Sequence, residues 1–140
     1  MWRELTNVVL TVRTYPDLSP DLSVRRHIQQ NWRSRPALSL EDWHQAFWQP
    51  LKISQDVSAF VYQQMEFYSG LPFSKVVPDD RLVEDLQLPL VCWFDWECNL
   101  HDDFCDRFEI EISDLWDIGM LYTVRDFVIF LDRQLLSVNR

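Results

Sequence analysis

The sequence predicts an all-α fold, with a bundle of three to four helices over residues 53–140 and an N-terminal extension of two short helices over residues 1–52. Apolar residues recur at helical spacing in both parts, and the periodic segments begin at capping residues and end at prolines or glycines. The chain contains only two glycines, Gly70 and Gly119, which excludes a glycine-rich phosphate loop or dinucleotide turn. We expect the extension to pack on the bundle.

The extension begins with an ambiguous segment, followed by a helix. Residues 5–12 are apolar and β-branched, which suits a short strand or an apolar helix equally, and the prolines of "TYPDLSPDLS" indicate a turn. Residues 23–35 predict a helix capped by Ser23 and ended by the proline that follows. Its apolar face carries Val24, Ile28 and Trp32.

A second short helix is predicted in "LSLEDWHQAFW". Ser39 and Asp42 have the spacing of a capping box, in which each side chain bonds the backbone N–H of the other residue. Pro50 ends the helix, and its apolar face carries Leu40, Trp43 and Phe47.

A long amphipathic helix is predicted between Ser54, a cap, and Gly70, a stop signal. Its apolar stripe carries Val57, Phe60, Val61, Met65 and Tyr68. A loop with two prolines follows, and it closes on the apolar residues Leu82, Val83 and Leu86.

A second long helix is predicted after Pro89, through "CWFDWECNLHDDFCDRF", because apolar residues recur every four positions at Trp96, Leu100, Phe104 and Phe108. "EIEIS" is typical of a short extended piece, and "DLWDIGML" of a short turn or helix closed by Gly119. Thr123 and Asp126 form a capping box for a last helix. Its apolar face carries Val124, Phe127, Val128 and Leu131.

Charge is unevenly distributed along the chain. The net charge is −9, with a balance of +2 over residues 1–52 and −11 over residues 53–140. The C-terminal part should therefore repel nucleic acid and anionic membranes, and it should attract a basic protein surface.

Cysteine usage indicates a reducing compartment. Cys92, Cys98 and Cys105 form an odd set whose spacings suit neither a disulfide framework nor a zinc knuckle. We expect free thiols, buried or half-buried, and a cytoplasmic location. No apolar run approaches the roughly 20 residues that span a bilayer, and the apolar stretch near the start is too short and interrupted for a signal peptide.

Three stretches in order carry a family resemblance: "VVPDDRLVEDL", "FCDRFEIEISD" and "YTVRDFVIFL". Together they resemble the acyl carrier protein family over roughly residues 53–137, matching its loop into the second helix, the end of that helix and the start of its last helix. The resemblance implies a carrier-like helical scaffold.

The residue that would hold the family's prosthetic group is absent. In that family, phosphopantetheine is esterified to a serine at the start of the second helix. Counted forward from Leu86 the serine's place falls on Leu90, and counted back from Phe108 it falls on Phe94. The chain is closer to small bacterial proteins with a carrier-like fold and no attachment serine, so we expect no covalent cofactor.

Aromatic residues cluster in "VCWFDWEC", around Asp95 and Glu97. On one helix, Trp93, Phe94 and Trp96 could not all lie on one apolar stripe. At least one of these rings should therefore meet solvent, the extension or a partner.

The stretch "HDDF" suits either a metal site or a solvated acidic helix face, and the second interpretation is favoured. We expect His101 to be exposed among carboxylates, which would favour its charged form, and His27 and His44 to be surface or half-buried. A basic patch on the extension should meet an acidic surface, either this chain's own C-terminal part or a second copy in a homodimer. The patch comprises Arg25, Arg26, Arg33 and Arg35, beside Trp32.

The sequence has no recognisable Ser/His/Asp or Cys/His signature, so we expect a non-catalytic interaction module that docks a basic partner on an acidic second-helix face, without metal, nucleic acid or membrane. The alternative is a binder of a small molecule or acyl chain, with an aromatic pocket near Trp93 and Trp96. The candidate partner-binding residues are Trp93, Phe94, Asp95, Glu97, Asp102, Asp103 and Asp106.

Overall fold

The computed structural model describes residues 19–113 and 116–138, and these residues form helices joined by loops. They contain no β-strand, only an isolated bridge between Arg81 and Thr123, so the all-α class is confirmed. The α-helices are α2 (Leu22–Asn31), α3 (Leu40–Trp43), α4 (Gln55–Ser69), α5 (Leu88–Val91), α6 (Trp96–Phe108) and α7 (Val124–Val138). A π-helix, η1 (His44–Trp48), and three 3₁₀ turns, η2 (Gln49–Leu51), η3 (Phe73–Lys75) and η4 (Ile118–Met120), complete the elements.

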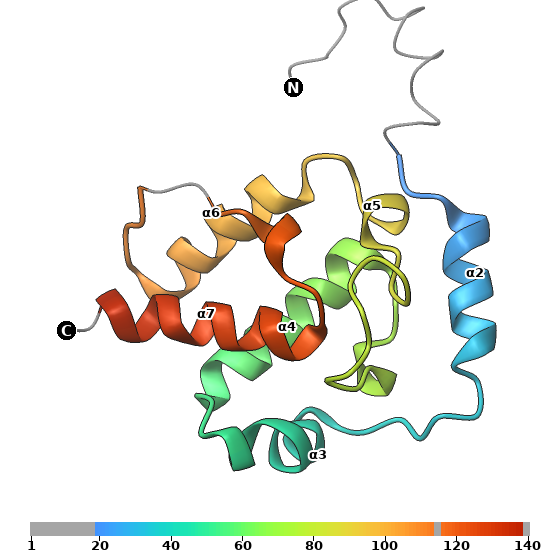
Figure 1. Ribbon diagram of the computed structural model, residues 1–140, viewed down its shortest axis with the longest axis horizontal. Helices are drawn as coiled ribbons and strands as arrows, with labels where there is room; N and C mark the ends of the chain where they lie inside the picture. The colour runs from blue at the N-terminus through green and yellow to red at the C-terminus, as the bar shows by residue number, and fades with distance from the viewer. Residues whose placement is uncertain (1–18, 114–115, 139–140) are drawn as a thin grey trace, which may run out of the picture.

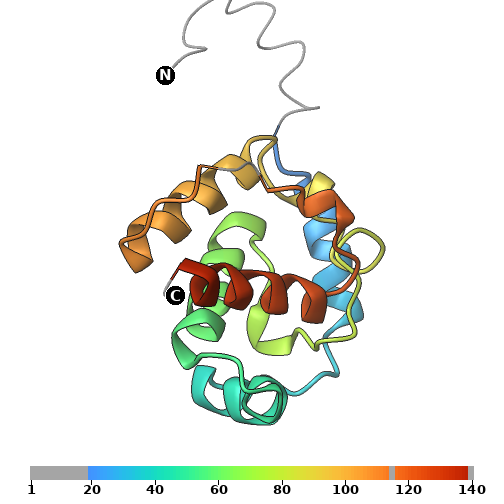
Figure 2. The same ribbon diagram turned by 60° about the vertical axis from the view of Figure 1, so that its left-hand side comes forward.

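Helix α4 lies in the middle of the molecule. Figures 1 and 2 show α6 and α2 on opposite sides of it, with α7 crossing it. Helix α4 contacts α6, α7, η1 and η3, whereas α2 contacts α5. The expected carrier-type arrangement of this bundle stays a prediction.

One apolar core runs through both halves of the chain. Rings of the N-terminal half are packed in the same buried cluster as rings of α4, α6 and α7. The division into two domains near Lys52 stays a prediction. The bulkiest members of the cluster include Trp43, Trp48, Phe60, Phe73, Phe104 and Phe127.

The predicted caps and stripes of α4 and α7 are confirmed. Ser54 caps α4 by accepting the N–H of Asp56 at 3.2 Å, and Gly70 ends it at φ 73°. Thr123 Oγ1 accepts from the N–H of Asp126 at 3.2 Å, and Asp126 accepts from the N–H of Thr123 at 3.1 Å. The predicted stripe residues of α4 and α7 are all buried.

The predicted start and end of the first helix are wrong, although its apolar face is right. Asp21 is the cap of α2, because its carboxylate accepts the N–H groups of Ser23 and Val24 at 3.0 and 3.2 Å. The helix ends at Asn31, well before the proline. Residues 5–12 and the first proline of "TYPDLSPDLS" lie outside the described residues, as do residues 114 and 115.

The second short helix departs from regular α-geometry, although its Ser39 cap is confirmed at 3.1 Å from the N–H of Asp42. After Trp43 the chain forms the π-helix, in which the N–H of Gln49 bonds the carbonyl of His44. In an α-helix, residues 43 and 48 would point about 140° apart. The wider π-turn lets both tryptophans enter the core, with ring centroids 5.4 Å apart, and His44 is buried as well.

The second long helix starts later than expected. Helix α6 begins at Trp96, and the residues before it form the short helix α5 and a connector. Trp93 and Phe94 lie in that connector, so the expectation that they share one helix with Trp96 is wrong. Trp96, Leu100 and Phe104 are buried and Phe108 is partly buried, as the four-residue spacing predicts. Val83 in the preceding loop is 56% exposed rather than buried.

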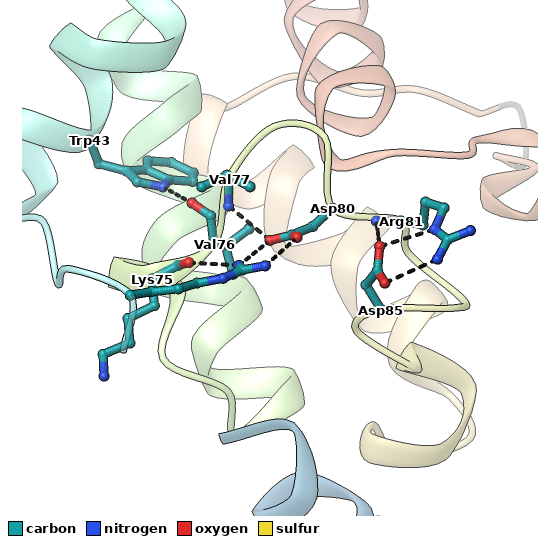
Figure 3. Close-up of polar contacts among 8 residues, drawn as sticks. Trp43, Lys75, Val76, Val77, Asp80, Arg81 and Asp85 are labelled. Atoms are coloured by element: carbon teal, nitrogen blue, oxygen red, sulfur yellow. Dashed lines mark hydrogen bonds and ion pairs between the residues drawn. The ribbon is translucent and has the colours of Figure 1, made fainter. Parts of the chain in front are cut away.

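The loop between η3 and α5 is fixed by a buried carboxylate, Asp80, which is 5% exposed (Figure 3). Its two oxygens accept from Nη1 and Nη2 of Arg35 at 2.7 and 2.9 Å and from the N–H of Val77 at 2.9 Å. The carbonyl of Asp80 accepts from the N–H of Val124 at 2.9 Å. One residue thus joins the N-terminal half, the loop and the start of α7.

Two further bonds hold the same loop in place. Trp43 donates its indole N–H to the carbonyl of Val76 at 2.8 Å, and Arg81 pairs with Asp85 at 3.1 Å (Figure 3). The pKa of Asp85 is lowered mainly by its hydrogen bond from Arg81.

We predict that Asp80→Ala lowers the free energy of unfolding by about 2–4 kcal/mol, because it leaves Arg35 and the Val77 N–H without their acceptor. The neighbouring Asp79→Ala is the matched control. Asp79 pairs with Arg125 at 2.6 Å, but its side chain is 81% exposed, so the loss should stay below about 0.5 kcal/mol. Urea unfolding of the two variants measures the difference, and equal losses would contradict the role given to Asp80.

Candidate partner-binding site at the start of helix α6

A cavity of about 580 Å³ lies where α2 begins, α4 ends and α6 begins. Its aromatic walls come from α4, from the connector and from the first residue of α6. Trp93 and Trp96, which the sequence analysis placed near a pocket for a small molecule or acyl chain, both line the cavity. Its rings and charged groups are Phe67, Tyr68, Trp93, Trp96, Arg25, Asp95 and Asp103.

The α2 wall of the cavity is anchored to the end of α5. The N–H of Asp21 donates to the carbonyl of Leu90 at 2.8 Å. Arg25 donates from Nε and Nη2 to the carbonyl of Val91 at 3.1 and 2.8 Å. The arginine is therefore held by two donors of its rigid fork rather than by an acid.

Gly70 allows this arginine to approach the end of α4. A Cβ at this position would lie 2.6 Å from Cζ of Arg25, and the backbone has a φ of 73°, which favours glycine. Gln29 donates to the carbonyl of Gly70 at 3.1 Å. The positive φ and the close approach of Arg25 therefore both favour a glycine here.

Asp103 forms a hydrogen bond with a residue of α4. The sequence analysis had instead predicted that this acid belongs to a solvated helix face. The hydroxyl of Tyr68 donates a short hydrogen bond to its carboxylate. Burial and this bond to Asp103 raise the pKa of Tyr68, so the phenol stays protonated. Asp103 lies at the edge of the cavity rather than on the outer surface.

The other predicted acids divide between two sides of α6. Asp102 and Asp106 lie within about 40° of each other on the exposed side of the helix, and Asp95 at the N-cap begins the same stripe. Glu97 points about 140° away from Asp102. Burial and the nearby Asp117 raise the pKa of Glu97. The structure therefore brings Asp95, Asp102 and Asp106 onto one side of α6, whereas Glu97 is exposed on another side of the helix.

The exposed rings include one that the sequence analysis missed. Trp93 is 42% exposed and Phe94 is 51% exposed, but only Trp93 lines the cavity. Trp96 is 7% exposed, so its ring forms a buried wall. Phe67, missed because it lies at the edge of the apolar stripe of α4, is 79% exposed at the cavity rim.

Two of the three histidines differ from the sequence-based expectation, whereas His27 is on the surface as expected. His101 is half-buried, with its ring 4.7 Å from Trp116 and its Nδ1 3.8 Å from Asp102. His44 is buried, with Nδ1 2.7 Å from the hydroxyl of Ser58, and His27 is exposed. Within residues 19–113 and 116–138, no three His, Cys, Asp or Glu side chains are grouped to hold a metal ion.

The basic patch is partly used within the chain. Arg35 pairs with Asp80 and packs over the ring of Trp32 at 4.9 Å, and Arg25 bonds the carbonyl of Val91. These contacts match the expectation that the patch meets this chain's own C-terminal part. Arg26 and Arg33 are exposed, and a homodimer through the four arginines stays a prediction.

The three cysteines are free thiols with different exposure: Cys98 is exposed, Cys105 is half-buried and Cys92 is buried. Exposure of Cys98 corrects the expectation that all three are at least half-buried. Burial raises the pKa of Cys92 to about 12, which leaves its thiolate scarce at neutral pH.

We predict that a thiol reagent at pH 7.5 modifies Cys98 first, Cys105 more slowly and Cys92 only after unfolding, since thiolate formation and access control the reaction. Mass spectrometry of peptides at successive times identifies the modified residue. In Cys98→Ser the fast phase should disappear. Rapid modification of Cys92 in the folded protein would contradict the prediction that burial protects this thiol.

No helix in the described ranges combines the length and apolar character that crossing a bilayer requires. Comparison of the chain with family models, with curated proteins and with solved structures gave no match. The site must therefore be interpreted from its own geometry and chemistry.

Proposed function

We propose that this chain is a non-catalytic, cytoplasmic protein-interaction module that docks a basic partner on the exposed side of α6. The observation that carries the proposal is the stripe of Asp95, Asp102 and Asp106, which begins beside the cavity with its exposed aromatic rim. An acidic stripe next to exposed rings supplies both electrostatic attraction and apolar contact area.

The charge of the whole chain supports this partner chemistry. Residues 53–140 carry a balance of −11, and the side chain of Asp102 is 79% exposed. Exposed carboxylates steer a basic surface during association, and salt should screen their attraction.

The resemblance to acyl carrier proteins supports a scaffold without their cargo. The two positions that correspond to the attachment serine are Leu90, in α5, and Phe94, in the connector. Neither side chain has a hydroxyl for a phosphodiester bond. The proposed carrier-like protein therefore acts through its surface rather than through a pantetheine arm.

A second candidate function is the binding of a small molecule or acyl chain. The cavity volume of about 580 Å³ lies in the range of ligand pockets, and four aromatic rings line the cavity. Asp95 and Asp103 disfavour an acyl chain, because contact with hydrocarbon would remove water from their carboxylates without replacing its hydrogen bonds. We therefore prefer the docking function.

We predict that the double variant Asp102→Asn, Asp106→Asn binds fluorescently labelled hexalysine about fivefold more weakly, since two exposed charge pairs are lost. The double variant Glu41→Gln, Glu84→Gln removes the same charge from two exposed positions elsewhere. Fluorescence anisotropy at low salt measures both affinities. An equal loss of affinity in the control variant would show that the probe responds to net charge alone. That result would contradict docking on the exposed side of α6.

We also predict that a phosphopantetheinyl transferase with coenzyme A adds no mass to the folded protein. An acyl carrier protein in the same reaction mixture shows that the transferase is active. Intact-mass spectrometry detects the product, and a gain of one phosphopantetheine would contradict the proposal of a cargo-free scaffold.

A further inference from the structure

We propose that the cavity at the start of α6 receives an arginine side chain of the basic partner. This inference rests on the docking function proposed above and names the residue that anchors the partner. The cavity walls, the charges around it and its place at the head of the acidic stripe each point to a guanidinium group.

The aromatic walls suit a flat cation. Phe67, Tyr68, Trp93 and Trp96 line one cavity, and the rings of Phe67 and Tyr68 have centroids 5.9 Å apart. A cation over a ring face is attracted by about 0.5–2 kcal/mol, and guanidinium also stacks on rings because it is planar. An ammonium group gains the first effect but not the second.

The acids of the cavity supply a hydrogen-bond partner for that cation. Neither oxygen of Asp95 accepts a hydrogen bond from a described residue, although Asp95 lies at the N-cap of α6. A guanidinium group can bond both oxygens of a carboxylate at once. Asp103 adds a second negative charge and is held in place by Tyr68.

Arg25 does not reverse this charge preference. Its Nε and Nη2 are both directed to the carbonyl of Val91. With Asp95 and Asp103, its single positive charge leaves the cavity at a net charge of −1. Asp102 and Asp106 on the same helix make the surroundings more negative. An anionic ligand would meet this repulsion, whereas a cation is favoured.

The position of the cavity sets the spacing of the partner's charges. With a rise of about 1.5 Å per helical residue, Asp102 lies roughly 10 Å along α6 from Asp95, and Asp106 lies roughly 6 Å further. An extended chain covers these distances in about three and two residues. The fitting segment has arginine at one position and further basic residues three and five positions away.

The test uses the full chain and a synthetic peptide of this pattern: arginine, two glycines, lysine, glycine and lysine, with blocked ends. The reversed peptide covers the opposite chain direction. Matched peptides carry lysine, citrulline or norleucine in place of the arginine. Citrulline keeps the shape of arginine without its charge, and norleucine offers only an apolar side chain. Indole N–H signals in ¹⁵N NMR spectra report binding at each tryptophan.

We expect the arginine peptide to shift the indole signals of Trp93 and Trp96 but not those of the core residues Trp43 and Trp48. Replacement by lysine should weaken binding about threefold, and replacement by citrulline or norleucine about tenfold. Phe67→Ala and Asp95→Asn should each weaken the arginine peptide about threefold to fivefold. Met120→Ala and Glu84→Gln, exposed positions that do not line the cavity, should leave its affinity unchanged.

Failure of this inference is distinguishable from failure of the docking function. If all four peptides bind equally, and if Asp102→Asn weakens their binding whereas Phe67→Ala does not, the docking function stands and the arginine site is overturned. No binding of any peptide would overturn both proposals. Stronger binding of the norleucine peptide, or shifts of Trp93 and Trp96 with decanoate alone, would overturn the arginine site in favour of an apolar ligand.

Discussion

The arrangement of this protein depends on the buried carboxylate of Asp80. Transfer of a charge from water to a protein interior is costly, and Asp80 offsets this cost with two bonds from Arg35 and one from the N–H of Val77. Its carbonyl also accepts the first N–H of α7, so the loop is held from both directions. An apolar residue could fill the volume but could not connect three segments that lie far apart in the sequence.

The candidate site depends on this loop through the backbone. The N–H of Leu88 bonds the carbonyl of Leu82, which places α5 directly after the fixed part of the loop. The end of α5 then presents the carbonyls of Leu90 and Val91 to α2. A cavity wall made by Arg25 is thus positioned by contacts that begin at Asp80, although the two residues lie on different segments.

Local signals in the sequence were sufficient for α4 and α7. Ser54, Gly70, Thr123 and Asp126 act through bonds to residues only a few positions away, so a pattern within one segment contains the information. Asp102 and Asp106 could be assigned to the exposed side of α6 for the same reason. Only the periodicity of one helix is needed for that inference.

Contacts between segments were not predictable in this way. The bond from Tyr68 to Asp103 depends on how α4 and α6 approach each other, which the pattern of either helix alone does not show. Arg25 was correctly assigned to a patch that meets the C-terminal part, but its acceptor is a backbone carbonyl, which no residue type reveals. The start of α6 was misplaced because the aromatic residues before it continue the apolar character of the helix.

The π-helix η1 bears on where the chain can change in length. Its extra residue per turn rotates Trp48 toward the same side as Trp43, where both rings are fully buried. Deletion of one residue between them would restore the spacing of an ordinary α-helix and would still allow every backbone bond of the turn. Because residues four apart on an α-helix point only about 40° apart, the two tryptophans would stay on the same side, so this turn can change in length by one residue while both rings remain in the core.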